Sequence, residues 1–308
     1  MKSLAKKIGG LALVSASLTA CSSTATTEGD KVQPLAADKQ VVKTFARFVP
    51  ERKDDFAWEN DLVAFRSYGP ANRARPENSG VDCWLKRVNY SIIDLWYGRH
   101  QQGISYHKDH GEGLDNYHVG TSMGCGSTGV WLDNHLFQLE TYASWKVLET
   151  STEKSVFQLE FKNEKNGVEY REVKTFSIAL GERLYRVDSQ FFVDGKIAPN
   201  LEVVVGVTTH NEAATVSMDL KAGWVAAHEN LEGSYLGTAV AVGANNPIEF
   251  VHTGHSKGVK DKGDAMIVTK TDNQGRLTYW SGYGWEKQGV IKNSQDWTEY
   301  LNAFIQAK

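Results

Sequence analysis

The sequence predicts an all-β protein, a large antiparallel β-sandwich that ends in a short helix. In the second half of the chain, apolar and polar residues alternate within short runs, and Gly, Asn and Asp separate one run from the next. These runs follow one another without the strand–helix–strand rhythm of a parallel sheet, which favours a large antiparallel sandwich.

The strand runs are clearest from residue 157 onward. Phe157, Leu159 and Phe161 alternate with polar residues, and Asn166-Gly167 then provides a strong signal for a tight hairpin. Five further strands are predicted from alternating or β-branched runs, namely Val168–Ile178, Leu184–Val193, Leu201–Thr209, Thr238–Val242 and Ala265–Lys270.

One helix is predicted, at the end of the chain. Ser294 is suited to be its N-cap, and Asp296 then falls in the first turn, where a carboxylate is favourable. Trp297, Leu301 and Phe304 recur at helical spacing, so one face of this helix should pack on the sandwich.

The first 43 residues resemble an export signal and a tether. Residues 1–20 combine three lysines with a short apolar stretch, and Leu18-Thr19-Ala20-Cys21 has the pattern of a bacterial lipoprotein processing site. We expect Cys21 to carry the lipid and residues 21–43 to form a flexible tether before a single domain, 44–308. The predicted location is the bacterial cell envelope, anchored to the outer membrane on its periplasmic side or at the surface.

Composition excludes several classes of protein. The formal net charge is −3, and it becomes −6 without residues 1–20, so the basic surface of a nucleic-acid-binding protein is not indicated. A phosphate-binding Gly-rich Lys-Ser/Thr loop does not occur, and the sequence shows neither a dinucleotide fingerprint after a predicted strand nor a Gly-x-Ser-x-Gly elbow between a predicted strand and a helix.

Two cysteines follow Cys21. Cys83 and Cys125 could form a disulfide in an exported protein or could be buried thiols, and the sequence leaves both open. A CxxC zinc knuckle is absent, and nothing in the sequence requires a cofactor.

Residues 50–61 are a candidate sugar-binding segment. Seven charged residues occur there together with Phe56 and Trp58. Sugars are bound by aromatic faces and by carboxylates and amides that contact their hydroxyls, which makes Trp58, Glu59 and Asn60 candidates. A surface loop with two core aromatics is the alternative.

Adjacent cations and a histidine-rich segment come next. Lys86 and Arg87 could neutralise an acidic substrate. The segment 106–118 contains three His, three Asp or Glu, one of which is Asp115, and two Tyr, and two mechanisms compete for it. His107, Asp109, His110 and Glu112 could bind a divalent metal, although their spacing is not that of a helical zinc motif. Alternatively, His and Tyr side chains act as general acid and base.

Four motifs carry a resemblance to a known family. They are VPERKDDFAWENDLVAFRSYGP (49–70), SGVDCWLKR (79–87), YHKDHGEGLDNYHVGTSMGCG (106–126) and the closing GWEKQG and DWTEYLNAF. The sequence resembles a domain-of-unknown-function family of bacterial polysaccharide-utilisation clusters that includes the ulvan-oligosaccharide dehydratases. The resemblance covers the chain after about residue 44 and implies a supersandwich similar to galactose mutarotases and polysaccharide lyases.

The activity that this resemblance implies is removal of water across C4 and C5 of a terminal uronic acid. The substrate would be an acidic oligosaccharide, and three tasks follow: neutralising the carboxylate, taking the C5 proton and protonating the 4-hydroxyl. We expect Arg66, Lys86 or Arg87 to meet the carboxylate, His107 or His110 with Tyr117 or His118 to transfer protons, and Glu59, Asn60 and Asp115 to bind hydroxyls.

Rival functions remain open at this point. A glycoside hydrolase would use a carboxylate pair, for which Glu112 with Asp115 or Glu59 could serve. A lyase would cut internal uronosyl linkages, and a carbohydrate-binding lipoprotein would leave its ligand unchanged.

Overall fold

A computed structural model describes residues 42–243, 247–254, 259 and 261–308. The predicted signal, Cys21 and nearly all of the predicted tether lie outside the described residues. Contacts place residues 40–308 in one compact unit. No helix among the described residues is both long and apolar enough to cross a membrane.

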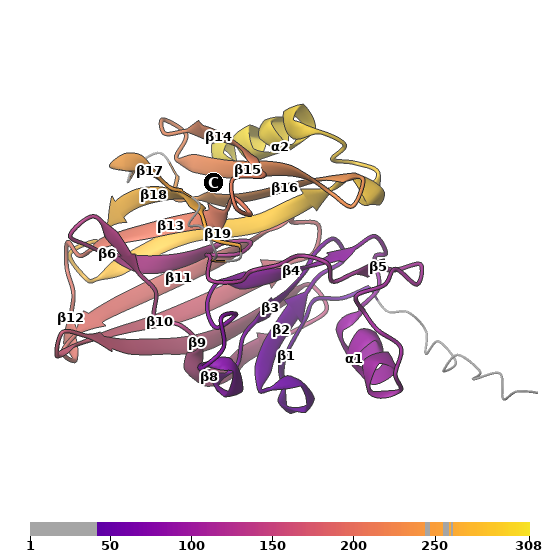
Figure 1. Ribbon diagram of the computed structural model, residues 1–308, viewed down its shortest axis with the longest axis horizontal. Helices are drawn as coiled ribbons and strands as arrows, with labels where there is room; N and C mark the ends of the chain where they lie inside the picture. The colour runs from indigo at the N-terminus through magenta and orange to yellow at the C-terminus, as the bar shows by residue number, and fades with distance from the viewer. Residues whose placement is uncertain (1–41, 244–246, 255–258, 260) are drawn as a thin grey trace, which may run out of the picture. The chain divides into compact units, whose positions relative to one another are not determined.

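The largest element is a nine-stranded antiparallel sheet (Figure 1). Its strand order is β14-β15-β16-β19-β11-β10-β9-β8, and β12 pairs with β11. The strands are β8 (Tyr142–Thr150), β9 (Lys154–Lys165), β10 (Val168–Ala179), β11 (Leu184–Val193), β12 (Lys196–Ile197), β14 (Thr215–Asp219), β15 (Trp224–Leu231), β16 (Ser234–Ala241) and β19 (Arg276–Trp285).

The predicted alternation and hairpin are confirmed in this sheet. Phe157, Leu159 and Phe161 on β9 are buried, whereas the residues between them are partly exposed. Asn166 and Gly167 both have positive φ, 55° and 79°, as the tight turn between β9 and β10 requires.

Two five-stranded antiparallel sheets complete the β-structure. One has the order β17-β18-β13-β6-β7, and the other runs from β1 to β5 in sequence. Their strands are β1 (Phe45–Val49), β2 (Asp55–Glu59), β3 (Ala64–Ser67), β4 (Val81–Lys86), β5 (Gly113–Leu114), β6 (Ser127–Leu132), β7 (His135–Phe137), β13 (Glu202–Thr208), β17 (Glu249–Thr253) and β18 (Asp264–Lys270). All three sheets contribute to one large apolar core, so the predicted all-β sandwich is confirmed.

The sheet β1–β5 presents two different faces. Because side chains alternate along a strand, Phe56, Trp58 and Phe65 point together into the large core. The Trp58 ring lies 5.3 Å from Phe157 and 5.2 Å from Phe176, between ring centroids. The opposite face carries Ala57, Ala64 and Trp84, which pack with α1 in a second apolar cluster.

In the part of the chain that the structure describes, two α-helices and three short 3₁₀ helices accompany the sheets. They are α1 (Ile93–Gln101), α2 (Ser294–Gln306), η1 (Pro50–Arg52), η2 (Pro70–Asn72) and η3 (Glu286–Gln288). The predicted C-terminal helix is confirmed as α2, with buried Trp297 and Leu301, but its N-cap is Asn293, not Ser294. The Asn293 side chain accepts hydrogen bonds from the backbone N–H groups of Gln295 and Asp296.

Helix α1 is not predicted by the sequence analysis. Only Ile93, Trp96 and Tyr97 of this nine-residue helix are buried, and they pack against Trp84 and Tyr106. Three buried residues in a short helix do not produce a clear apolar face in the sequence. Cys83 and Cys125 are joined by a disulfide, with 5.8 Å between their Cα atoms, which decides the question that the sequence left open.

Candidate functional site

Three charged side chains gather on the face of the β1–β5 sheet that points away from the large core. Arg66 on β3 lies directly opposite Asp82 on β4 and Ala57 on β2. Asp55 is two residues before Ala57 and therefore lies on the same face. All three are buried, at 5% exposure or less. Strand register thus brings together charges that are up to 27 residues apart in the sequence.

Arg66 is surrounded by carboxylates. Its guanidinium donates to Asp82, reaches Asp115 Oδ2 at 3.4 Å and lies 3.7 Å from Asp55 Oδ2. Burial raises the pKa of Asp55 to about 6 and that of Asp115 to about 6, although the charge of Arg66 acts in the opposite direction. Burial and the neighbouring Asp115 raise the pKa of Asp82 well above its ordinary value, and the charge of Arg66 opposes this shift.

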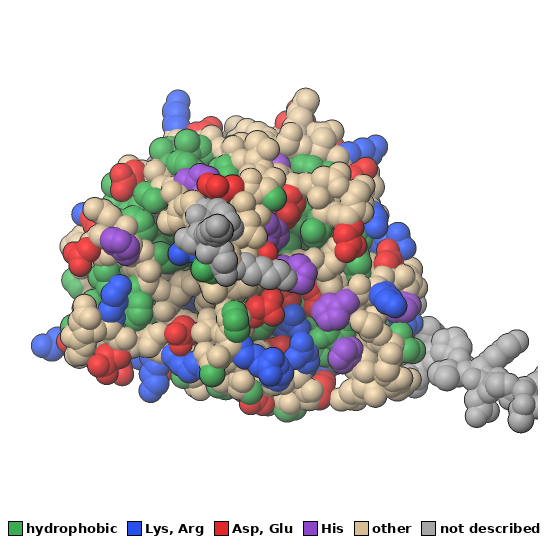
Figure 2. Space-filling model, viewed as in Figure 1, with side chains coloured by type: hydrophobic (Ala, Val, Ile, Leu, Met, Phe, Trp, Pro, Cys, Tyr) green, Lys and Arg blue, Asp and Glu red, His purple; other side chains and the backbone are tan. Residues whose placement is uncertain are grey.

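A cavity of about 660 Å³ opens over this cluster. We call it the basic cavity. It is lined by Arg52, Lys53, Asp55, Arg66, Tyr68, Asn72, Arg75, Pro76, Glu77, His118, Gly120, Thr121, Val259 and Asp261. Its volume is in the range of small-ligand sites. On the face drawn in Figure 2, basic side chains gather beside acidic and histidine side chains.

Three of the cations that line the basic cavity are not neutralised. Within the described residues, Arg52, Lys53 and Arg75 take part in no ion pair, and the Arg52 guanidinium donates only to the Tyr106 hydroxyl, at 3.0 Å. Burial and the positive charges of Arg75 and Arg52 lower the pKa of Lys53, so both arginines repel the Lys53 ammonium. A bound anion would relieve this repulsion.

Two turns hold Asp55 in place: the Lys53-Asp54 turn that precedes it and the segment of Gly69 and Asn72 that packs against it. Lys53 and Asp54 have left-handed backbone angles, with φ of 53° and 58°. A side chain at Gly69 would meet the Asp54 carbonyl, because a Cβ there would lie 1.9 Å from that oxygen. Because Gly69 has no side chain, the two segments lie close together, and Asp55 Oδ1 accepts from the Gly69 N–H at 3.0 Å and from Asn72 Nδ2 at 3.2 Å. Asp55 Oδ2 has no hydrogen-bond donor among the described residues.

His118 lies exposed at the same cavity, and its backbone carbonyl is hydrogen-bonded by His210. His210 Nε2 lies 2.6 Å from the His118 carbonyl oxygen, and Nδ1 lies 2.8 Å from Glu229. Both partners only accept, so the two contacts are satisfied together by a protonated imidazolium. Burial acts to lower the pKa of His210, but the hydrogen bond and charge of Glu229 outweigh it and raise the pKa.

Of the four predicted catalytic residues, only His118 lines the basic cavity. His107 donates from Nδ1 to the Asp115 carbonyl at 2.7 Å and its side chain is half exposed. His110 is exposed and donates from Nε2 to the Ser105 carbonyl at 3.0 Å. The Tyr117 ring is buried against His210, 4.6 Å between centroids. The side chains of these three residues contact their own loop or His210, and none of them lines the basic cavity.

Most predicted substrate-binding residues serve the fold instead. Lys86 is fully buried, and its ammonium donates to Glu59, to the Asn60 carbonyl and to the Tyr90 carbonyl. The Glu59 carboxylate also accepts from the N–H groups of Ile92 and Ile93 at the start of α1.

Three other residues that were predicted to bind substrate, Asn60, Trp58 and Arg87, also have structural partners. The Asn60 amide donates to the carbonyls of Ala179 and Glu182, and Trp58 is a core residue. Arg87 is exposed and holds the following loop through Asp109, at 3.1 Å. Arg66 and Asp115 do belong to the site, but as a buried ion pair beneath the basic cavity, so neither is free to bind a substrate carboxylate or hydroxyl in the expected way.

The alternative metal and hydrolase sites do not assemble. Within the described residues, no three His, Cys, Asp or Glu side chains are grouped so as to hold a metal ion. Asp109 is engaged by Arg87, and Glu112 by Arg99 at 2.7 Å. The carboxylates proposed for hydrolysis have separate partners, since Glu59 pairs with Lys86 and Asp115 with Arg66.

Four of the site residues that sequence reasoning missed are in the segments it selected. Arg52, Lys53 and Asp55 fall within 50–61, and Asp82 lies just before Lys86. The available signal was the two-residue alternation of β2, β3 and β4, which places Asp55, Arg66 and Asp82 on the face opposite Trp58. Tyr68, Asn72 and Arg75, by contrast, carried no recognisable pattern.

Comparison with known proteins places the chain in a family. A family model described as a domain of unknown function (DUF4861) matches residues 13–307. The chain belongs to the DUF4861 family. A relative from Formosa agariphila, named Uncharacterized protein P7, is 33% identical over 276 residues, which cover 85% of this chain and 67% of that protein. The DUF4861 match includes all the residues that form the basic cavity.

Proposed function

We propose that the protein eliminates water from the non-reducing-end uronic acid of an oligosaccharide, giving a 4,5-unsaturated uronosyl product. The observation that carries this proposal is the basic cavity, in which three unpaired cations stand beside a buried carboxyl group and an imidazole. A uronate is an anion with many hydroxyls, and its carboxylate would be held by Arg52, Lys53 and Arg75.

Charge neutralisation has a chemical purpose in this reaction. Removal of the C5 proton places negative charge on the carbon next to the carboxylate, and cations at the carboxylate oxygens stabilise that charge as it develops. Arg66 contributes less to this task, because three carboxylates already surround it.

Two residues at the basic cavity are suited to the proton transfers. The His118 imidazole would take the C5 proton, and the electron pair left on C5 would form the C4=C5 bond. The C4–O bond breaks, and the departing hydroxyl takes a proton from Asp55 to leave as water. The raised pKa of Asp55, about 6, supports its role as the acid, and Oδ2, which has no hydrogen-bond donor among the described residues and lies 3.7 Å from Arg66, is the atom that would carry the proton.

The test is to incubate the purified protein with oligosaccharides that end in glucuronate, iduronate, mannuronate or galacturonate. The proposal predicts new enoate absorbance and a product lighter by one water, with no chain cleavage. An alkene with shortened products would make the protein a lyase that cuts internal linkages. Binding without any change in mass would make it a carbohydrate-binding protein.

Variants connect the activity to the basic cavity. Replacing both cations in K53Q/R75Q should raise KM strongly for the uronate substrate, because carboxylate binding is lost. Lys196 is an exposed lysine on β12, so K196Q is a control that removes one positive charge outside the cavity lining, and it should behave as wild type. Equal effects of K53Q/R75Q and K196Q would remove the cavity from the proposal.

We also propose that Cys21 anchors the protein to the cell envelope, on the strength of the sequence pattern at residues 18–21. Labelling with a fatty-acid precursor should mark the wild-type protein and not C21S. Label retained in C21S would refute the anchor.

A further inference from the structure

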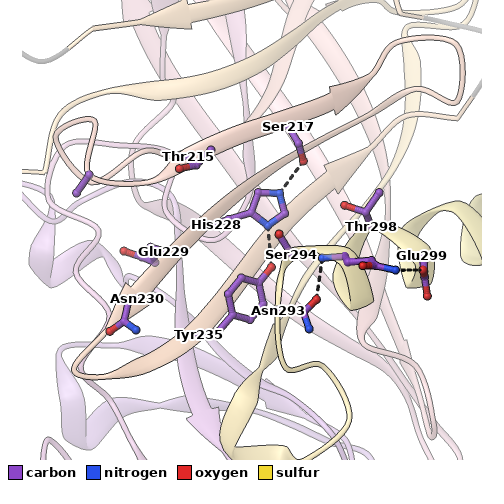
Figure 3. A pocket seen from close by; sticks show the side chains of 12 residues that line it. Thr215, Ser217, His228, Glu229, Asn230, Tyr235, Asn293, Ser294, Thr298 and Glu299 are labelled. Carbon is purple, nitrogen blue, oxygen red and sulfur yellow. Dashed lines mark hydrogen bonds between the residues drawn. The ribbon is translucent and has the colours of Figure 1, made fainter.

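A second cavity, of about 830 Å³, lies between the strands β14–β16 and the start of α2 (Figure 3). We call it the hydroxyl cavity. Thr215 and Ser217 of β14, His228 of β15 and Tyr235 of β16 form one wall, and Asn293 and Thr298 are contributed from the side of α2. None of these residues belongs to the basic cavity.

The centre of this wall is a relay of two hydroxyl groups and one imidazole. Figure 3 shows His228 between Ser217 and Tyr235. His228 Nε2 lies 2.6 Å from Ser217 Oγ, and Nδ1 lies 2.7 Å from the Tyr235 hydroxyl. His228 is 8% exposed, and burial lowers its pKa, which favours the neutral form of the ring.

A neutral ring makes the two hydroxyls complementary. One ring nitrogen donates and the other accepts, so one hydroxyl must accept from the ring while the other donates to it. The accepting hydroxyl keeps its own O–H for a ligand, and the donating hydroxyl keeps free lone pairs. Exchange of the ring tautomer reverses the two roles. The relay therefore offers one donor and one acceptor in either order, which matches ligand hydroxyls that can themselves donate and accept.

The charges at the hydroxyl cavity disfavour an acidic ligand. None of the described residues that line it is Lys or Arg. Its two carboxylates already have partners, Glu229 with His210 and Glu299 with the Gln295 side chain at 2.9 Å. The basic cavity, with its three unpaired cations, shows the opposite character.

From these observations we infer that the hydroxyl cavity is a second saccharide-binding site, which takes uncharged sugar residues. Its wall of hydroxyl and amide groups satisfies sugar hydroxyls, and the lack of cations in its lining disfavours uronate, sulfate and phosphate groups. This inference does not depend on the proposed elimination reaction, because binding here requires no chemistry at the basic cavity.

The test is calorimetric titration of the full protein with neutral trisaccharides, such as xylotriose, cellotriose and mannotriose. We expect at least one of them to bind, with a Kd on the order of 1 mM. Thr215 is exposed on the edge strand β14, so T215W should fill the cavity without disturbing the core and weaken binding about tenfold or more. Y235F, which removes one hydroxyl of the relay, should also weaken binding.

The control is T150W, the same replacement at an exposed position of the other edge strand, β8, and it should bind as wild type. K53Q/R75Q should also bind the neutral sugar normally, which separates failure of this site from failure of the elimination proposal. The inference is overturned if no neutral trisaccharide binds at concentrations up to about 50 mM. It is equally overturned if T215W binds as well as T150W.

Discussion

Replacing Asp55 by Asn tests the electrostatics of the basic cavity directly. In the folded protein, burial raises the pKa of Asp55 from 3.8 to about 6. The folded state therefore binds this proton more tightly than the unfolded state does. Its contribution to stability is complete below pH 3.8 and is lost as the pH rises through about 6. The difference between the two pKa values corresponds to about 3 kcal/mol of unfolding free energy.

D55N should lack this pH dependence, because an amide does not ionise. Asn can still accept from the Gly69 N–H and the Asn72 amide through Oδ1, so the fold should be retained. The other buried carboxyls are present in both proteins and largely cancel in the comparison; the exception is Asp115, whose pKa is raised in part by the charge of Asp55. Between about pH 3.5 and 7.5, the unfolding free energy of D55N should rise relative to wild type by about 3 kcal/mol.

The assay is urea denaturation, followed by circular dichroism across this pH range. Asp133 lies exposed in the turn after β6, so D133N is the matched control and should run parallel to wild type. If D55N also runs parallel to wild type, within about 0.5 kcal/mol, the inferred pKa of Asp55 is wrong.

The same variant tests catalysis. If Asp55 protonates the leaving hydroxyl, D55N should lower kcat by about 10²–10⁴-fold. Wild-type kcat should fall as the pH rises above about 6, because the acid loses its proton. Near-native kcat in D55N would mean that another group supplies the proton.

Three further predictions concern the groups around the cavity. K86M should destabilise the protein by about 3–5 kcal/mol in urea denaturation, because it leaves the Glu59 carboxylate buried and unpaired. Unchanged stability together with a raised KM would instead indicate that Lys86 binds the substrate. H210Q should lose about 1–3 kcal/mol at low pH, since the His118 carbonyl and Glu229 lose a shared donor. That loss should shrink as the pH rises through the raised pKa of His210, and a loss independent of pH would contradict the imidazolium. C83A/C125A, which opens a disulfide between residues 42 apart, should lower stability by about 4 kcal/mol, and an unchanged urea midpoint would contradict the bond.

The fold class was predictable because local patterns agree with the tertiary structure. Phe157, Leu159 and Phe161 alternate because one face of β9 meets the core, and that pattern is visible without knowing the partner strand. Helix α2 was predictable for the same reason, since Trp297 and Leu301 lie on one face. Helix α1 was not, because Trp84, Tyr97 and Tyr106 bury it within a mixed cluster that has no helical period in the sequence.

The site was predictable as segments and not as residues. The charge-rich stretch 50–61 and the histidine-rich stretch 106–118 do meet at the basic cavity, where Asp55 and His118 both contribute to the lining. Histidines and aromatics drew attention by composition, yet His107 and His110 are engaged by backbone carbonyls of their own loop. Composition could not distinguish a side chain that closes a loop from one that faces a ligand.

By itself, the sequence determined the all-β class, the hairpin at Asn166-Gly167, the C-terminal helix and the segments that carry the chemistry. Only the tertiary structure decided which charges are available there. Along one face of the β1–β5 sheet, Lys86 and Glu59 neutralise each other in full burial, whereas Asp55 stands at the basic cavity. The physical reason is that burial and an ion-pair partner decide whether a charged side chain is available to a ligand. Strand register brings that partner from a distant part of the chain.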